Sequence, residues 1–152
     1  MQSRLPRRRC LSLLCKAMDG EAPATVVIAD DSPAIREAIQ IAISAQEGMV
    51  VAGSCADGAE AVRLVERLRP TLALIDVHMP NGGASLAARL KAVSDRTKVV
   101  VITADDSPAL AAHAISSGAN AYLLKFSTSS LISRLAAVLD GHLINDAKPS
   151  QM

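Results

Sequence analysis

The residues best suited to chemistry stand at the ends of short apolar runs of the chain. Asp30 and Asp31 follow one run and Asp76 follows another, while Thr103 ends a third and Lys125 follows a fourth. Three carboxylates brought together resist joint ionisation, and a divalent cation with oxygen ligands, such as Mg²⁺, relieves their repulsion. A metal, a carboxylate, a hydroxyl and an ammonium together make a pocket for a phosphoryl group. In that pocket Asp76 is the expected nucleophile, forming an acyl phosphate.

The elements that must position these side chains are five nearly continuous runs of Val, Ile, Leu and Ala. Buried parallel strands have this composition because helices cover both faces of their sheet. The runs are Thr25–Ala29, Met49–Ser54, Thr71–Ile75, Lys98–Thr103 and Ala121–Leu124. Apolar residues at helical spacing fill the segments between the runs, and Gly141 follows the last helical pattern as a stop. The alternation predicts an α/β fold with a doubly wound, five-stranded parallel sheet, flavodoxin-like (βα)5 in type.

The expected strand order, 2-1-3-4-5, brings the first and third strands together where the order reverses. Ligands of such sheets bind beyond the carboxyl ends of the strands at this switch point. The pair Asp30 and Asp31 then faces Asp76 across one crevice. The candidate site is therefore predicted at this edge of the sheet.

One short sequence, Ala-Asp-Asp-Ser-Pro-Ala, occurs twice, at residues 29–34 and 104–109. In both copies the serine can cap a helix and the proline suits its first turn, so helix initiation accounts for the shared Ser-Pro letters. We expect the acids of the first copy to belong to the site. Those of the second copy, Asp105 and Asp106, are expected on its rim rather than at a second metal.

Four motifs together resemble the receiver domain of bacterial two-component response regulators. They are Asp30-Asp31, Asp76-Val77-His78-Met79-Pro80, Thr103-Ala104 and Tyr122-Leu123-Leu124-Lys125, in this order and each at the end of a predicted strand. The similarity runs from about Thr25 to Gly141. The Tyr-Leu-Leu-Lys form is similar to the receivers of helix-turn-helix transcription regulators.

The resemblance implies a role for each residue at the acidic end of the pocket. Asp76 matches the phospho-acceptor and is also one of the metal ligands. Asp30 and Asp31 match the acid pair that holds Mg²⁺, and of the two Asp31 is the one expected to bind the metal directly. The backbone carbonyl of His78 stands where the family supplies a further ligand to the metal.

The resemblance also implies a switch. Thr103 and Lys125 match the pair that grips the phosphoryl group, and Tyr122 matches an aromatic residue whose ring turns inward as the threonine moves. A plain core aromatic is the alternative interpretation of Tyr122. The surface expected to change comprises the fourth helix, fifth strand and fifth helix, where the family commonly docks or dimerises, so a homodimer is one expected assembly.

Two features depart from the family pattern. Phe126 follows the lysine where the family usually has a proline in a cis peptide, and the loop after Pro80 reads Asn-Gly-Gly. His78 and Asp105 occupy two variable positions that flank the pocket and, in this family, tune the lifetime of the phosphoryl group.

The composition of the chain limits the partners and the cellular compartment that we expect for the protein. The net charge is +1 and the only aromatic residues are Tyr122 and Phe126, so direct nucleic-acid binding is not expected. No apolar run approaches the roughly 18 residues of a membrane span, and the three cysteines form no framework, which is typical of the cytoplasm. Residues 1–24 are predicted to be a flexible basic tail, 25–141 the receiver domain, and 142–152 a C-terminal tail.

We therefore expect a stand-alone receiver, not an enzyme, that takes a phosphoryl group from a sensor histidine kinase or phosphotransfer protein and acts on a downstream protein target. One alternative is a degenerate receiver that docks partners without phosphorylation. Another is a transcription regulator truncated before its DNA-binding domain. An aspartate-dependent phosphatase is the enzymatic alternative, but it would need an acid where His78 stands.

Overall fold

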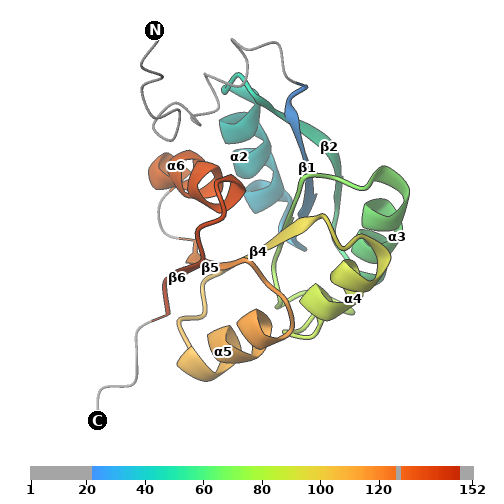
Figure 1. Cartoon of the computed structure of the whole chain (residues 1–152), viewed down its shortest axis with the longest axis vertical. Helices are drawn as coiled ribbons and strands as arrows, with labels where there is room; N and C mark the ends of the chain where they lie inside the picture. Colours follow the sequence, from blue (N-terminus) through green and yellow to red (C-terminus); the bar gives the residue numbers. More distant parts are fainter. Residues whose placement is uncertain (1–21, 126–127, 148–152) are drawn as a thin grey trace, which may run out of the picture.

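Six parallel strands form one sheet with helices on both of its faces in the computed structural model, which describes residues 22–125 and 128–147 (Figure 1). The strands are β1 (Ala24–Ala29), β2 (Met49–Cys55), β3 (Leu72–Ile75), β4 (Lys98–Thr103), β5 (Ala121–Leu124) and β6 (Ile144–Asn145). The helices are α2 (Pro33–Ser44), α3 (Gly58–Leu68), α4 (Leu86–Val93), α5 (Pro108–Ser116) and α6 (Thr128–Leu139). None of the helices in this part of the chain is long and apolar enough to span a bilayer.

The sheet divides the core into two apolar layers, as Figure 1 shows with α2 and α6 on one face and α3, α4 and α5 on the other. Successive strand residues point to opposite faces, so Val27 and Ala29 pack towards α3–α5 while Val26 and Ile28 pack towards α2 and α6. All four of these side chains are buried. This two-sided burial explains why the strands read as continuous apolar runs.

The strand order is β2-β1-β3-β4-β5-β6, so the predicted order of the first five strands is confirmed. The prediction of five strands was incomplete. Ile144 and Asn145, assigned to the C-terminal tail, pair in parallel with Ala121 and Tyr122 of β5. A two-residue strand is too short to show any periodicity, and its apolar member packs partly buried against the layer under α2 and α6.

Both copies of the repeated sequence begin a helix by the same local bonds. Ser32 caps α2 by accepting a hydrogen bond from the Ile35 amide, and Ser107 caps α5 by accepting one from Leu110. A proline follows at the first helical turn in each case. The predicted capping role of the Ser-Pro letters is confirmed.

The loop from β2 to α3 lies against the loop that follows β3. The amide of Gly58 donates to the carbonyl of Pro80 over 2.8 Å. A Cβ atom added to Gly58 would lie only 1.9 Å from the backbone carbonyl oxygen of Asn81. Glycine is therefore required here by a close approach of two backbones, and the approach anchors the loop that carries His78.

We predict that Gly58→Ala lowers the free energy of unfolding by about 2 kcal/mol, because backbone atoms must move to admit the methyl group. Urea unfolding monitored by circular dichroism measures the loss. Gly53→Ala is the matched control: the three atoms nearest its added Cβ belong to the flexible side chains of Leu68 and Leu64, at 3.3 Å and beyond. Equal losses for the two variants would contradict the steric explanation.

Candidate functional site

Two buried aspartates stand at the ends of neighbouring strands. The sheet ladder continues into them, because the Asp76 amide donates to the carbonyl of Ala29 (2.9 Å) and the Asp30 amide to that of Cys55 (3.0 Å). Only 2% of Asp30 and 5% of Asp76 is exposed. Backbone pairing between β1, β2 and β3 therefore fixes the two positions from which the carboxylates extend.

Lys125, which follows β5, bridges the two carboxylates. Its Nζ lies 2.8 Å from Oδ2 of Asp30 and 2.7 Å from Oδ2 of Asp76. The remaining oxygen of each carboxylate accepts a backbone amide two residues further on, Ser32 for Asp30 and His78 for Asp76, both at 2.9 Å. The two buried carboxylates thus share one ammonium, and each also accepts one backbone amide.

The protonation state of Lys125 follows from these neighbours. Partial burial lowers the pKa of the ammonium, but the hydrogen bonds and negative charges of Asp30 and Asp76 outweigh it and hold the pKa above its ordinary value. The lysine is therefore charged across the physiological range.

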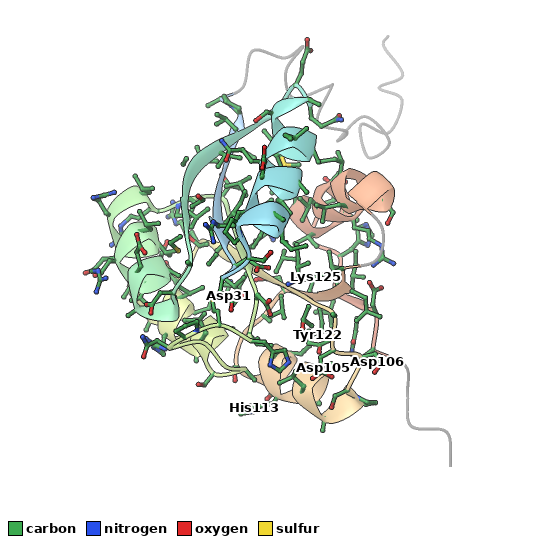
Figure 2. The ribbon with its side chains drawn as sticks, turned by 180° about the vertical axis from the view of Figure 1, so that it is seen from behind. Asp31, Asp105, Asp106, His113, Tyr122 and Lys125 are labelled. Atoms are coloured by element: carbon green, nitrogen blue, oxygen red, sulfur yellow. The ribbon has the colours of Figure 1, made fainter. Side chains whose placement is uncertain are left out.

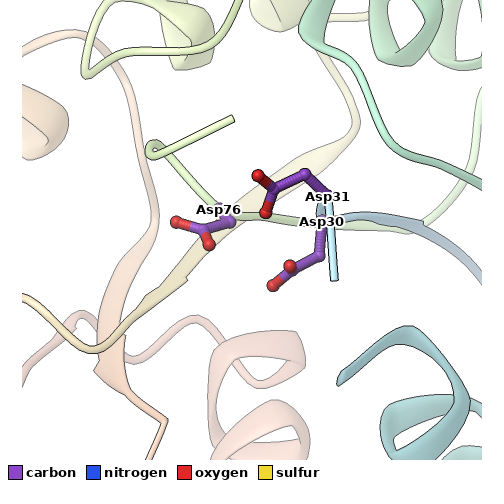
Figure 3. Close-up of side chains that lie close together, drawn as sticks. All are labelled: Asp30, Asp31 and Asp76. Atoms are coloured by element: carbon purple, nitrogen blue, oxygen red, sulfur yellow. The ribbon is translucent and has the colours of Figure 1, made fainter. Parts of the chain in front are cut away.

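Asp31 completes a cluster of three acids (Figure 3). One carboxylate oxygen from each of Asp30, Asp31 and Asp76 lies within 4.8 Å of the other two. Asp31 is exposed, so the cluster opens to solvent on that side. An all-oxygen set of carboxylates beside an open position suits a hard divalent cation that keeps several of its waters.

The loop after Asp76 is held in place from outside the site. Within the loop, the amide of Gly83 donates to the carbonyl of Val77 over 2.8 Å. From the β2–α3 loop, Asp57 accepts a hydrogen bond from the Asn81 side chain over 2.8 Å. This bond and the backbone amides at the start of α3 lower the pKa of the Asp57 carboxyl. The pair therefore pins the loop that follows the central aspartate.

The second copy of the repeat forms the rim of the site. Asp105 accepts the Ser107 amide at 2.9 Å, repeating the bond between Asp30 and Ser32. Its other oxygen lies 3.0 Å from Nε2 of His78, so two loops meet across the mouth of the site. The Ser107 amide, and then His78, lower the pKa of the Asp105 carboxyl. The predicted rim position of Asp105 is confirmed.

Thr103 and Tyr122 lie below this rim. The buried Thr103 hydroxyl oxygen accepts the Asp105 amide at 3.2 Å. The fully buried Tyr122 donates its phenolic hydrogen to the backbone carbonyl of Asp105. Figure 2 shows Tyr122 near Asp105 and Asp106, with Lys125 and Asp31 above it in this view. Burial, and then the charges of Asp105, Asp106 and Asp76, raise the pKa of Tyr122 to about 12.

The structure brings together most of the residues that the sequence singled out. Asp30, Asp31, Asp76 and Lys125 share one cluster, and Thr103 joins it indirectly, since its carbonyl accepts the Lys125 amide over 3.0 Å. Phe126 and the peptide that joins it to Lys125 lie outside the described residues, as do residues 1–21 of the predicted N-terminal tail.

Two aspartates that hold the surroundings of the site in place, Asp57 and Asp146, were not predicted from the sequence. Asp57, before a glycine and a helical pattern, had a recognisable helix-cap signal, and it does accept the amides of Ala59 and Glu60. Asp146 had no local signal, because its contacts with Leu124 and Arg134 join residues that are distant in the sequence.

Comparison with known proteins agrees with this geometry. The family model of the response regulator receiver domain matches residues 26–136. The probable transcriptional regulatory protein NarL of Mycobacterium tuberculosis is 40% identical over 116 residues, covering 76% of this chain and 53% of that protein. The oxygen regulatory protein NreC of Staphylococcus epidermidis is 35% identical over 127 residues, covering 81% and 58%.

A solved structure agrees as well. The signal receiver domain of the putative response regulator NarL from Mycobacterium tuberculosis superposes with a TM-score of 0.75 at 34% identity, covering 79% of this chain and 98% of that one. The chain spans little more than half the length of the two curated relatives. On the family match and these similarities, the chain belongs to the response regulator receiver domain family of two-component signalling proteins.

Proposed function

We propose that the chain receives a phosphoryl group on Asp76 from a sensor histidine kinase or a phosphotransfer protein. The observation that carries this proposal is the position of the Asp76 carboxylate, which touches Lys125 and shares a cluster with Asp30 and Asp31. A side-chain oxygen of Asp76 attacks phosphorus, the bond from phosphorus to the donor histidine nitrogen breaks, and that nitrogen keeps the electron pair. The product is an acyl phosphate on Asp76.

Asp30, Asp31 and Asp76, with the backbone carbonyl of His78, are the proposed ligands of Mg²⁺. The all-oxygen donor set of the three acids fits this ion. When bound, Mg²⁺ supplies positive charge beside the transferred phosphoryl oxygens. Lys125 contacts Asp76 directly, and its fixed charge needs no reorganisation during the transfer.

Thr103 and Lys125 are the proposed partners of the phosphoryl group once it is attached. An ammonium has three donors, and the carboxylates of Asp30 and Asp76 engage two of them. The Thr103 hydroxyl oxygen accepts a hydrogen bond from the Asp105 amide. The hydroxyl hydrogen of Thr103 is the proposed donor to the phosphoryl group. The same residues take part in the later hydrolysis of the acyl phosphate, so the chain assists its own phosphorylation and dephosphorylation.

The signal is proposed to leave through the surface of α5, β5 and α6. Two hydrogen bonds to a charged group contribute about 1.5–3 kcal/mol each, whereas moving an equilibrium from 1:99 to 99:1 needs about 5.5 kcal/mol. The switch is therefore expected to be substantial but incomplete. Tyr122 is its proposed reporter, since its hydroxyl binds the loop between Thr103 and α5.

The output of the whole protein is a separate proposal. The relatives are named as transcriptional and oxygen regulatory proteins, and the chain covers 53% and 58% of the two described above. We propose that this receiver controls its output through protein contacts in the cytoplasm, with a partner or a further copy of the chain. Enrichment of the chain on DNA would count against this route.

We predict that incubation with acetyl phosphate and Mg²⁺ adds about one phosphoryl mass, and that Asp76→Asn abolishes the gain because the nucleophile is lost. Intact-mass spectrometry measures both. Asp95→Asn is the control, since it removes an exposed carboxylate from the loop between α4 and β4. A folded protein that binds Mg²⁺ but gains no mass would instead support the phosphorylation-independent docking module.

Mg²⁺ is predicted to raise the melting temperature of the wild type. At a concentration 100 times the dissociation constant, its binding adds about 2.7 kcal/mol to the free energy of unfolding. Asp31→Asn should lose most of this gain, because the cluster loses its exposed carboxylate. Asp106→Asn is the matched control, since it changes the equivalent acid in the second copy of the repeat. Loss of the gain in both variants, or in neither, would refute the assignment of Asp31.

Tyr122, the only tyrosine in the chain, is predicted to ionise with a pKa of about 12 instead of about 10. Because the folded state keeps this proton after the unfolded state has lost it, stability should fall as the pH rises through this interval. Ultraviolet absorbance of the phenolate measures the titration, with circular dichroism monitoring the fold. A folded protein whose tyrosine titrates near 10 would contradict the buried, hydrogen-bonded position.

A further inference from the structure

Two successive backbone amides just before the pocket are held from opposite sides. The Lys125 amide donates to the carbonyl of Thr103 on β4 over 3.0 Å. The Leu124 amide points the other way and donates to Oδ2 of Asp146 over 3.1 Å. Since the Lys125 side chain extends from this backbone, both bonds restrict the positions that its ammonium can occupy.

Asp146 is itself bonded to two elements, β5 and α6. Its amide donates to the carbonyl of Tyr122 over 2.8 Å, which continues the pairing of β6 with β5. Its carboxylate forms an ion pair with Arg134 of α6, and 15% of the side chain is exposed. The next amide of β5 in this pairing, that of Leu124, therefore donates to the Asp146 carboxylate instead of to a backbone carbonyl.

We infer that Asp146 is a positioning residue for Lys125 and thereby supports the phosphoryl site. The lysine stem has four rotatable bonds, yet its Nζ must remain 2.8 and 2.7 Å from Asp30 and Asp76. Without Asp146, the Leu124 amide at the end of β5 loses its charged acceptor, and the backbone that carries Lys125 gains freedom. The inference rests on the proposed function.

The effect on two ligands separates positioning from general damage. On the proposed function, the phosphomimetic BeF₃⁻ is expected to bind the Lys125 ammonium. The same ammonium repels Mg²⁺, because the two cations compete for the same carboxylates. A lysine that leaves its place should therefore weaken BeF₃⁻ binding and leave Mg²⁺ binding unchanged or tighter. Unspecific loosening of the fold would weaken both.

The experiment measures dissociation constants for Mg²⁺ alone and for BeF₃⁻ in saturating Mg²⁺, on the full chain. Asp146→Ala is compared with wild type and with Asp140→Ala, which removes an exposed carboxylate directly after α6. Hydrogen exchange at the amides of Leu124 and Lys125 is measured without either ligand. Intact mass after acetyl phosphate treatment of the wild type tests the proposed function in the same preparation.

Asp146→Ala is expected to weaken BeF₃⁻ binding roughly tenfold, the loss of about one charge-assisted hydrogen bond. Mg²⁺ should bind at least as tightly as to wild type, the two amides should exchange faster, and Asp140→Ala should match wild type. Asp146→Asn keeps an oxygen acceptor for Leu124 but loses the ion pair with Arg134, so a loss of about threefold is expected. This variant carries the test if Asp146→Ala does not fold.

An unchanged BeF₃⁻ affinity in the Asp146 variants overturns the inference, as does an equal loss for Mg²⁺ and BeF₃⁻. A wild type that binds BeF₃⁻ and gains a phosphoryl mass while the variants behave normally defeats only the positioning role. A wild type that does neither defeats the proposed function itself.

Discussion

The site depends on one ammonium placed between two buried carboxylates. Asp30 and Asp76 have side chains that are only 3% and 6% exposed, and Lys125 contacts both. Removing one partner from a buried ion pair typically costs about 3–5 kcal/mol, because the remaining charge is left without compensation. The three residues follow β1, β3 and β5, so the arrangement exists only when strands distant in the sequence have paired. The charges of the site are thus compensated only in a chain whose sheet has this strand order.

The two Ala-Asp-Asp-Ser-Pro-Ala copies have the same local structure but lie at different positions relative to the acidic cluster. Each makes the same aspartate-to-amide bond and the same serine cap. Ala29 pairs with Ile75, and Ile75 pairs with Val101, so the alanine of the second copy, Ala104, lies three residues further along its strand than Ala29. With this offset, Asp105 lies beside His78 instead of in the acidic cluster. Identical local bonds therefore serve a buried site in one copy and its rim in the other.

Much of this arrangement could be predicted from the sequence, because β1, β3, β4 and β5 are buried on both faces and read as apolar runs. The polar residues at their ends then mark one edge of a parallel sheet. Strand β6 could not be predicted in this way, since two residues carry no period. The bond between Asp57 and Asn81 spans 24 positions and depends on how two loops meet. Contacts of this kind are properties of packing and leave no local pattern.

The short strand β6 also affects how the chain behaves beside other copies of itself. An uncovered strand edge presents unpaired amides and carbonyls, which can pair with a strand from another molecule. Here residues 144–146 occupy that edge of β5. β6 itself is only two residues long, so it offers an incoming strand little to pair with. Cutting the chain after Gly141 would uncover β5, and self-association and poor solubility would be the physical consequence.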